Sequence, residues 1–408
     1  MLAYLLSLVA IAALLAACSG VTPAAGGAGP AVVSEPISAP GTAADECSDE
    51  FDPDRDYFPN KASIEYAQNF TVEYHNHYKV VTIVEPWRDA GQGLQYVLVQ
   101  CGTPPPDGYP DATIIEVPVR TAISMSTTHL GYLEKLSLLD RLIGLGDGKY
   151  VNTEGVRQRL DEGELPEVGD GAEVNVEAVL ELNPDVVIAL GVGNASKDSH
   201  PMLLDAGVKV VMFSDFMESS PLGRAEWLKF MALLFNREAE AEAAFAEIAA
   251  RYQEVAAVAA DVTDRPTVFM GYDIRGTWYM PGGDSYAARY LADAGADYLW
   301  ANDGGTSRIP LDFESVYERA HDAEYWLNLS QFYTSLADVL AADERYGDFA
   351  AFQNHRVYNN NARLNQNGGN DYNESGLVNP DIILADIIKI LHPELMPDHE
   401  LVYYRHLQ

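Results

Sequence analysis

The feature that most constrains the fold is a long helical pattern, residues 223–262, that separates two stretches of alternating strand and helix patterns. From Arg237 to Val258 it contains neither glycine nor proline, and apolar side chains recur at helical spacing. About 25 helical residues would form a rod of about 37 Å. The pattern predicts one long helix that connects two lobes, although it also fits a surface helix within one domain.

Strand and helix patterns alternate on both sides of this segment. Strand patterns lie at 122–126, 185–190 and 208–213 before it, and at 267–272, 325–329 and 356–358 after it; a helix is expected over Pro380–Leu391. Such alternation is typical of parallel sheets with helices on both faces. The predicted fold class is therefore α/β, with two Rossmann-like lobes joined by one long α-helix.

The segment before the first lobe has a different pattern, with strands expected at 70–74, 80–84 and 96–99. It predicts a small N-terminal β subdomain of antiparallel strands. The expected divisions are an N-terminal β-rich extension (46–114), an N-lobe (115–222), the interlobe helix (223–262) and a C-lobe (263–408).

The N-terminus carries an export pattern. Residues 1–17 are almost wholly apolar and end in small residues before Cys18, which is typical of a signal peptide. A transmembrane helix is the alternative, although the run is slightly shorter than the roughly 20 residues that a span needs. Residues 18–45 are rich in Gly, Ala, Pro and Ser, which predicts a flexible tether.

The tetrad Leu15-Ala16-Ala17-Cys18 resembles the bacterial lipobox. The resemblance implies that Cys18 becomes the lipidated first residue and anchors an extracytoplasmic protein to the bacterial membrane. No Lys or Arg precedes the apolar run, which departs from the usual signal. Because the protein is expected to be exported, Cys47 and Cys101 could form one disulfide; the sequence leaves this open.

The formal net charge of −35 excludes nucleic acid as a natural partner, because its phosphates would be repelled. No G-x-S-x-G, H-E-x-x-H or G-x-x-x-x-G-K-[ST] motif occurs, so no catalytic residue is assigned. The nine histidines are scattered, so no metal ligand and no resident cofactor are assigned. An extracytoplasmic hydrolase and a direct metal-ion receptor remain alternatives.

A faint repeat places one glutamate at the same point of each lobe. Asn175 and Asp312 fit the N-cap of a short helix, and Glu177 and Glu314 then fall in its first turn. Acidic residues there stabilise the helix through its dipole, which is a sufficient structural reason for either alone. Their equivalent placement favours a shared role.

With Asn175-Val-Glu177, the following Asn-Pro-Asp-Val-Val-Ile run and the long helix, residues 115–395 resemble the helical-backbone class of periplasmic binding proteins. Members of that class serve ABC importers of iron-siderophores, heme and vitamin B12. The resemblance implies a monomeric, non-enzymatic receptor for a metal chelate, and it implies that Glu177 and Glu314 contact the two permease subunits. The turn after Glu314 matches the class less well.

The same resemblance implies a ligand site in the cleft between the lobes, on loops that follow the strands. Aromatic side chains there could stack on a chelate and arginines could pair with its acidic groups, although ordinary packing explains each residue alone. The candidates are Thr127, Thr128, His129, Tyr150, Tyr272, Arg275, Trp278, Tyr279, Tyr333 and Arg363.

Overall fold

The N-terminal extension forms a sheet of its own in the computed structural model, which describes residues 46–194 and 196–408. Strands β1 (Phe70–Tyr74), β2 (Tyr78–Ile83) and β3 (Leu94–Gln100) are antiparallel, as expected. A fourth strand, β4 (Thr113–Val117), runs parallel to β3 and was not expected. The predicted signal peptide, Cys18 and the tether lie outside the described residues.

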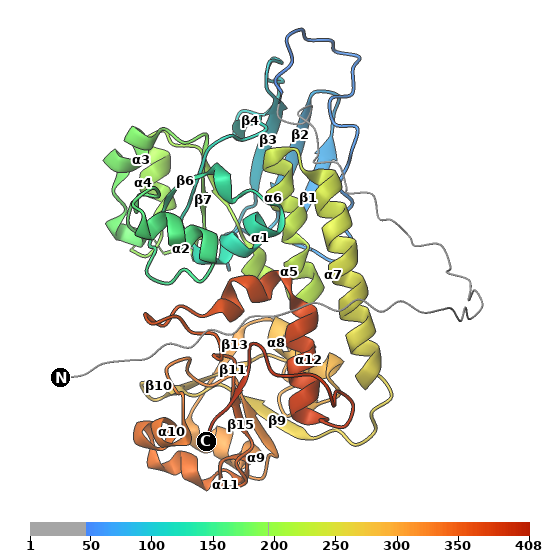
Figure 1. The fold of residues 1–408 in the computed structure, drawn as a ribbon, viewed down its shortest axis with the longest axis vertical. Helices are drawn as coiled ribbons and strands as arrows, with labels where there is room; N and C mark the ends of the chain where they lie inside the picture. The colour runs from blue at the N-terminus through green and yellow to red at the C-terminus, as the bar shows by residue number, and fades with distance from the viewer. Residues whose placement is uncertain (1–45, 195) are drawn as a thin grey trace, which may run out of the picture. The chain divides into compact units, whose positions relative to one another are not determined.

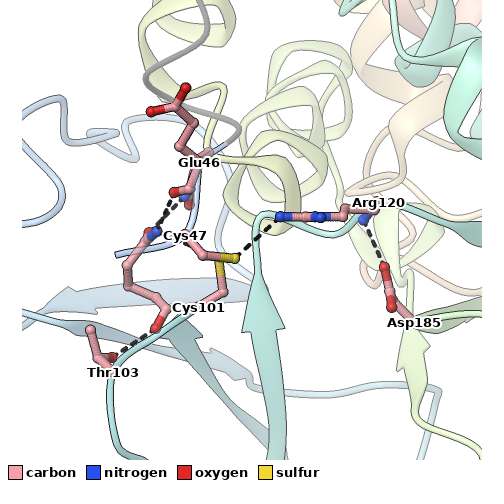
Figure 2. The surroundings of a disulfide bond; sticks show 8 residues. Glu46, Cys47, Cys101, Thr103, Arg120 and Asp185 are labelled. Atoms are coloured by element: carbon pink, nitrogen blue, oxygen red, sulfur yellow. Dashed lines mark hydrogen bonds between the residues drawn. A yellow bond between two sulfur atoms is a disulfide. The ribbon is translucent and has the colours of Figure 1, made fainter. Parts of the chain in front are cut away.

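A disulfide joins Cys47 to Cys101, with the two Cα atoms 4.8 Å apart (Figure 2). The Ser48 backbone N–H donates to the Cys101 carbonyl at 2.9 Å, so the chain beside the bond is also held. Arg120 approaches the Cys47 sulfur at 3.2 Å. The start of the described chain is thereby fixed to the end of β3.

The N-lobe contains a parallel sheet in the order β6-β5-β7-β8. Its strands are β5 (Ala122–Ser124), β6 (Leu142–Leu145), β7 (Val186–Ala189) and β8 (Val210–Met212). Its helices are α1 (Leu130–Lys135), α2 (Glu154–Asp161), α3 (Val176–Leu182) and α4 (His200–Asp205). The strands are short and almost wholly buried, as expected for a parallel sheet.

The C-lobe repeats this strand order. Its parallel strands follow the order β12-β9-β14-β15, and β16 adds an antiparallel edge. The strands are β9 (Thr267–Met270), β12 (Asp297–Tyr298), β14 (Tyr325–Leu327), β15 (Val357–Asn359) and β16 (Arg405–His406). The two parallel sheets confirm the predicted α/β fold class with two lobes.

A small antiparallel sheet lies within the C-lobe, formed by β10 (Asp273–Ile274), β11 (Thr277–Pro281) and β13 (Arg308–Leu311). The C-lobe helices are α8 (Tyr286–Asp293), α9 (Phe313–Ala320), α10 (Leu336–Ala342), α11 (Ala350–Gln353) and α12 (Pro380–Leu391). Helix α12 has the predicted bounds and begins at proline, whose fixed φ suits the first turn.

The single helix predicted over residues 223–262 is wrong, because the structure has three helices there. They are α5 (Pro221–Ala225), α6 (Trp227–Phe235) and α7 (Glu238–Ala259). Helix α6 ends where Asn236 adopts a left-handed conformation, with φ of 52°, which asparagine tolerates better than most residues. The 22 residues of α7 still span about 33 Å.

Helix α7 contacts both halves of the protein. Near its start, the Glu242 carboxylate accepts from the Ser63 backbone N–H of the extension at 2.6 Å. Near its other end, Arg251 pairs with Asp381 of α12 at 3.0 Å and the Tyr252 hydroxyl donates to Asp293 of α8 at 2.8 Å. Figure 1 shows α7 and α12 side by side. The connecting role predicted for this segment therefore falls to α7.

Buried charged side chains at the start of α6 bind the backbone of the extension. The Glu226 carboxylate is 0% exposed and accepts from the backbone N–H groups of Glu65, Tyr66 and Ala67. The Lys229 ammonium lies 2.9 Å from that carboxylate. Because burying a charge is costly unless it is paired, these contacts make the extension part of the N-lobe core.

A strap from the C-lobe, residues 365–378, packs against the N-lobe. Its Glu374 carboxylate accepts from the backbone N–H groups of Asn152 and Thr153 at 2.9 and 2.6 Å, and from the Thr153 hydroxyl. A Cβ at Gly131 of α1 would lie 2.5 Å from the Glu374 carbonyl, so the two backbones approach closely. The strap therefore covers the start of α1.

Within residues 46–194 and 196–408, no helix is both long enough and apolar enough to cross a membrane.

Candidate functional site

A cavity of about 1150 Å³ lies where strands of both lobes end. Gly271 and Tyr272 line it just after β9, Asn328 after β14, Asn360 after β15, and Val192 beyond β7. In sheets of this order, the carboxyl ends of the strands at the reversal of strand order form the usual ligand crevice. The topology of the two sheets therefore explains the position of the cavity.

The lining comes from three parts of the chain. The extension contributes Trp87 and Arg88, and the N-lobe side contributes Val192, Phe216, Met217, Glu218 and Arg224. The C-lobe contributes most of the remainder, including Tyr272, Tyr279, Tyr286, Arg308, Phe332 and Tyr372. Aromatic rings and guanidinium groups thus share the wall, which suits a solute with both apolar and acidic parts.

Arg224 is held at the cavity by a buried polar cluster. Its Nε donates to Asp215 Oδ2 at 2.8 Å, and its guanidinium lies 5.2 Å from the centre of the Tyr286 ring. The Tyr132 hydroxyl donates to the same Asp215 oxygen at 3.1 Å. Burial opposes the charge on Arg224, but the Asp215 carboxylate offsets this effect and holds the Arg224 pKa above the ordinary value. The cluster keeps one cation fixed at the wall.

Two tyrosines beside Arg224 keep their protons. Burial raises the pKa of Tyr286 and raises the pKa of Tyr372 still further above the ordinary value for phenols. Both side chains line the cavity. The Tyr286 hydroxyl donates to the Tyr290 hydroxyl at 3.4 Å, so these two rings add no negative charge beside Arg224.

Only two of the ten ligand candidates line the cavity: Tyr272 and Tyr279. Tyr333 is not part of the lining, but its ring centre lies 5.8 Å from that of Tyr272. Trp278 is fully buried, and its indole N–H donates to the Met270 carbonyl at 2.8 Å. Arg275 occupies the turn between β10 and β11, with φ of 56°, and does not line the cavity.

The N-lobe candidates lie away from the lining. His129 is 0% exposed, and its Nδ1 lies 2.8 Å from the Ser124 hydroxyl. Thr127 and Thr128 are half-buried in the same turn. Tyr150 is exposed and sits under Lys149, whose Nζ lies 4.9 Å from the centre of its ring. Burial lowers the pKa of His129 to about 4, so its imidazole is neutral near pH 7.

Arg363 is occupied within the C-lobe, where its Nε lies 2.5 Å from Asp371 Oδ2. Several lining residues were missed by the sequence analysis. Trp87 and Arg88 follow a strand of the extension, and Arg224 lies in the segment predicted as connecting helix. The strand-end pattern identifies none of these three, because each reaches the cavity from outside the parallel sheets.

The two glutamates of the repeat lie on matching helices. The Asn175 side chain caps α3 by accepting from the Ala178 N–H at 3.1 Å, and Asp312 caps α9 through Ser315 at 2.7 Å. The N-cap predictions are confirmed. Glu177 and Glu314 are both exposed in the first turn. Both carboxylates are thus available on the surface.

In the described part of the chain, a metal site would need several ligating side chains close together. No group of three or more His, Cys, Asp or Glu residues there could hold a metal ion.

These features define a two-lobed α/β binding protein with a cleft at its strand ends. A family model described as periplasmic binding protein matches residues 123–364, more than half of the chain. The chain belongs to the periplasmic binding protein family.

Individual proteins also resemble this chain in sequence or in fold. An uncharacterized lipoprotein of Methanocaldococcus jannaschii is 28% identical over 289 residues, which cover 69% of this chain and 67% of the relative. A periplasmic binding protein from Veillonella parvula shares the fold with a TM-score of 0.54 at 12% identity, covering 80% of this chain and 98% of that one. A periplasmic heme binding protein from Pseudomonas aeruginosa gives a TM-score of 0.51 at 18% identity, covering 71% and 98%.

Proposed function

We propose that this protein is the substrate-binding lipoprotein of an ABC importer, which captures a metal chelate of the iron-siderophore, heme or cobalamin kind. The observation that carries the proposal is the cavity of about 1150 Å³ between the lobes, with its aromatic and arginine lining. Ligand pockets of roughly 300–1,000 Å³ suit drug-sized molecules, so this cleft is large enough for a bulky chelate. The similarity in fold to a heme binding protein agrees with this class of cargo.

The chemistry of the wall supports the same cargo. The rings of Tyr272, Tyr279 and Phe332 offer faces for a conjugated or hydrophobic chelate. Arg224 offers charge for an acidic group beside the neutral Tyr286 hydroxyl. The cargo would be bound as a solute and would not be transformed, so the protein is proposed to be a receptor and not an enzyme.

Extracytoplasmic location and anchoring belong to the proposal. The lipobox-like tetrad at Cys18 and the lipoprotein relative support a lipid anchor on the outer face of the membrane. We also propose that the receptor works as a monomer and that Glu177 and Glu314 dock it onto the two permease subunits. Their exposure at matching helix starts supports that role.

The cargo is tested by titrating the purified protein with ferric siderophores, hemin and cobalamin and following its tryptophan fluorescence. The expected result is saturable one-to-one binding of at least one chelate, with the chelate recovered unchanged. Tight binding of free metal ions without any chelate would favour a direct metal receptor, and turnover would favour an enzyme. Either result overturns the proposal.

Docking is tested by the paired charge reversal Glu177→Lys and Glu314→Lys. Uptake of the bound chelate should be abolished, while its affinity for the isolated receptor stays unchanged. The matched control reverses two other exposed glutamates, Glu164→Lys and Glu344→Lys, one in each lobe. Uptake that survives the first pair, or that is lost equally in both pairs, contradicts the docking assignment.

A further inference from the structure

The loop between β2 and β3, residues 84–93, brings the extension to the ligand cavity. Trp87 and Arg88 at its tip line the cavity together with residues of both lobes. This segment precedes the residues that match the family model, which begin at 123. The loop therefore lies outside the part of the chain that the family model matches.

Contacts with the N-lobe fix the position of the loop. The buried Ser214 hydroxyl, which follows β8, donates to the Pro86 carbonyl at 2.8 Å. The Trp87 ring lies 5.1 Å from that of His200. A Cβ at Gly193 would lie 2.6 Å from Trp87, so the indole rests directly on this glycine, whose φ of 74° also favours glycine. Glycine at position 193 thus leaves the space that the Trp87 ring occupies, and a larger side chain at 193 would fill it.

The base of the loop is also fixed. The Asn69 side chain bonds the backbone of Glu85 at both its carbonyl and its N–H, at 2.9 Å each. Asn69 in turn donates its own N–H to the buried carboxylate of Glu218 at 3.0 Å. Because these anchors belong to the core of the extension and the N-lobe, the tip of the loop is positioned in advance of any ligand.

Charge at the cavity is opposite to that of the whole protein. Arg88 of the loop and Arg308 of the C-lobe are exposed at the wall, and neither pairs with a carboxylate among the described residues. Among the described residues that line the cavity, Glu218 is the one acidic residue, and its carboxylate accepts from the Trp227 indole and from backbone N–H groups. In a chain of net charge −35, two unpaired arginines on one cavity indicate an acidic ligand.

We propose that the loop of the extension is a third wall of the ligand site, on which Arg88, acting with Arg308, binds an acidic group of the solute beside the Trp87 ring. The cargo is then an anionic chelate, and a neutral one would bind more weakly. This inference rests on the proposed receptor function for the identity of the cargo. The anion preference of the wall, however, can be measured without any cargo.

Trp87 provides that measurement. The other four of the five tryptophans, Trp227, Trp278, Trp300 and Trp326, are at most 2% exposed, whereas Trp87 is half-buried. Collisional quenching of tryptophan fluorescence in the full protein therefore reports mainly on Trp87. Each quenching constant is divided by that of free N-acetyltryptophanamide, because iodide quenches indole more efficiently than caesium does. On this normalised scale iodide should exceed caesium, although the negative net charge would favour caesium at an ordinary surface position.

Variants assign this preference to the wall. Trp87→Phe should remove most of the quenching, and Arg88→Gln or Arg308→Gln should lower the iodide quenching constant about twofold. Arg55→Gln, an exposed arginine of the extension outside the cavity, is the matched control and should change nothing. Preferential quenching by caesium would contradict the proposal that the loop forms a third, anion-binding wall of the site. Quenching that persists in Trp87→Phe would contradict it as well.

The second arm uses hemin, whose propionates supply acidic groups. Hemin should protect Trp87 from iodide, and Arg88→Gln should raise its dissociation constant about tenfold while Arg55→Gln leaves it unchanged. Unchanged hemin affinity in both Arg88→Gln and Arg308→Gln overturns the acidic-group contact. If no chelate binds but iodide still quenches Trp87 better than caesium, the proposed receptor function is wrong while the proposed anion preference of the wall is supported.

Discussion

The first strand of each lobe ends at an equivalent point of its sheet, yet the residues that follow have opposite surroundings. After β9 of the C-lobe, Tyr272 lines the cavity. After β5 of the N-lobe, His129 is buried. Equal strand order therefore does not give equal access to a ligand, because what packs over each strand end differs.

The difference has two structural sources. On the N-lobe, the strap from the C-lobe lies against α1, where the Glu374 carbonyl meets Gly131, and covers the region next to His129. The loop carrying Trp87 and Arg88 then supplies the side chains that this lobe does not present from its first strand. The N-lobe side of the cleft thus combines two side chains of the extension with residues that follow β7 and β8, whereas the C-lobe side is made by its own strand ends and loops.

The largest effect is expected from separating the extension from its lobe. Glu226→Ala leaves three buried backbone N–H groups without their acceptor and removes the fully buried carboxylate beside Lys229. The Lys229 ammonium then keeps only the partly exposed Glu242 carboxylate at 3.2 Å and the Ser63 carbonyl. Loss of one partner of a buried pair costs about 3–5 kcal/mol. Urea unfolding should show that loss, and the hemin site should weaken with it. A loss below about 1 kcal/mol would mean that the extension is not part of the N-lobe core.

The burial of His129 should make stability depend on pH. Its pKa falls from 6.5 to about 4 in the folded protein because burial penalises the charged imidazole. The unfolded chain therefore binds a proton that the folded chain excludes, and stability present above pH 6.5 is lost as pH falls towards 4. The expected contribution is about 3 kcal/mol across that window.

The measurement compares urea unfolding of the wild type and His129→Gln at pH 7 and pH 4.5. The variant should lose less stability on acidification, and the exposed His321→Gln serves as the control. Equal pH dependence in all three proteins would show that His129 is accessible to water, and the contrast with Tyr272 would then fail.

The alternation of strands and helices and the helix caps could be predicted, because they depend on local patterns such as Asn175 and Asp312 before short apolar helices. The break at Asn236 could not, since the helical pattern continues on both sides of a single left-handed residue. Of the ligand candidates, only Tyr272 and Tyr279 line the cavity, and both belong to the C-lobe. Trp87 and Arg224 reach the cavity through tertiary packing, which no local pattern encodes.

A smaller effect is expected at the C-lobe wall itself. Tyr272→Ala removes a ring that lines the cavity, and a lost aromatic contact of roughly 1.4 kcal/mol raises the dissociation constant about tenfold. Hemin titration should show this weakening, while Thr128→Ala on the N-lobe leaves the affinity unchanged. A similar loss in both variants would show that the two strand ends contribute alike.

The smallest effect on stability is expected at the docking glutamates, where the lobes differ only slightly. Glu314 is 78% exposed and lies 3.4 Å from Arg345, whereas Glu177 has no side-chain partner among the described residues. Because exposed ion pairs contribute little, Glu177→Gln and Glu314→Gln should each change the free energy of unfolding by less than about 0.5 kcal/mol. Uptake should fall in both variants, and more for Glu177→Gln, because Arg345 already holds Glu314 partly away from a permease arginine. A larger loss of uptake for Glu314→Gln than for Glu177→Gln would show that the C-lobe glutamate contributes more to docking.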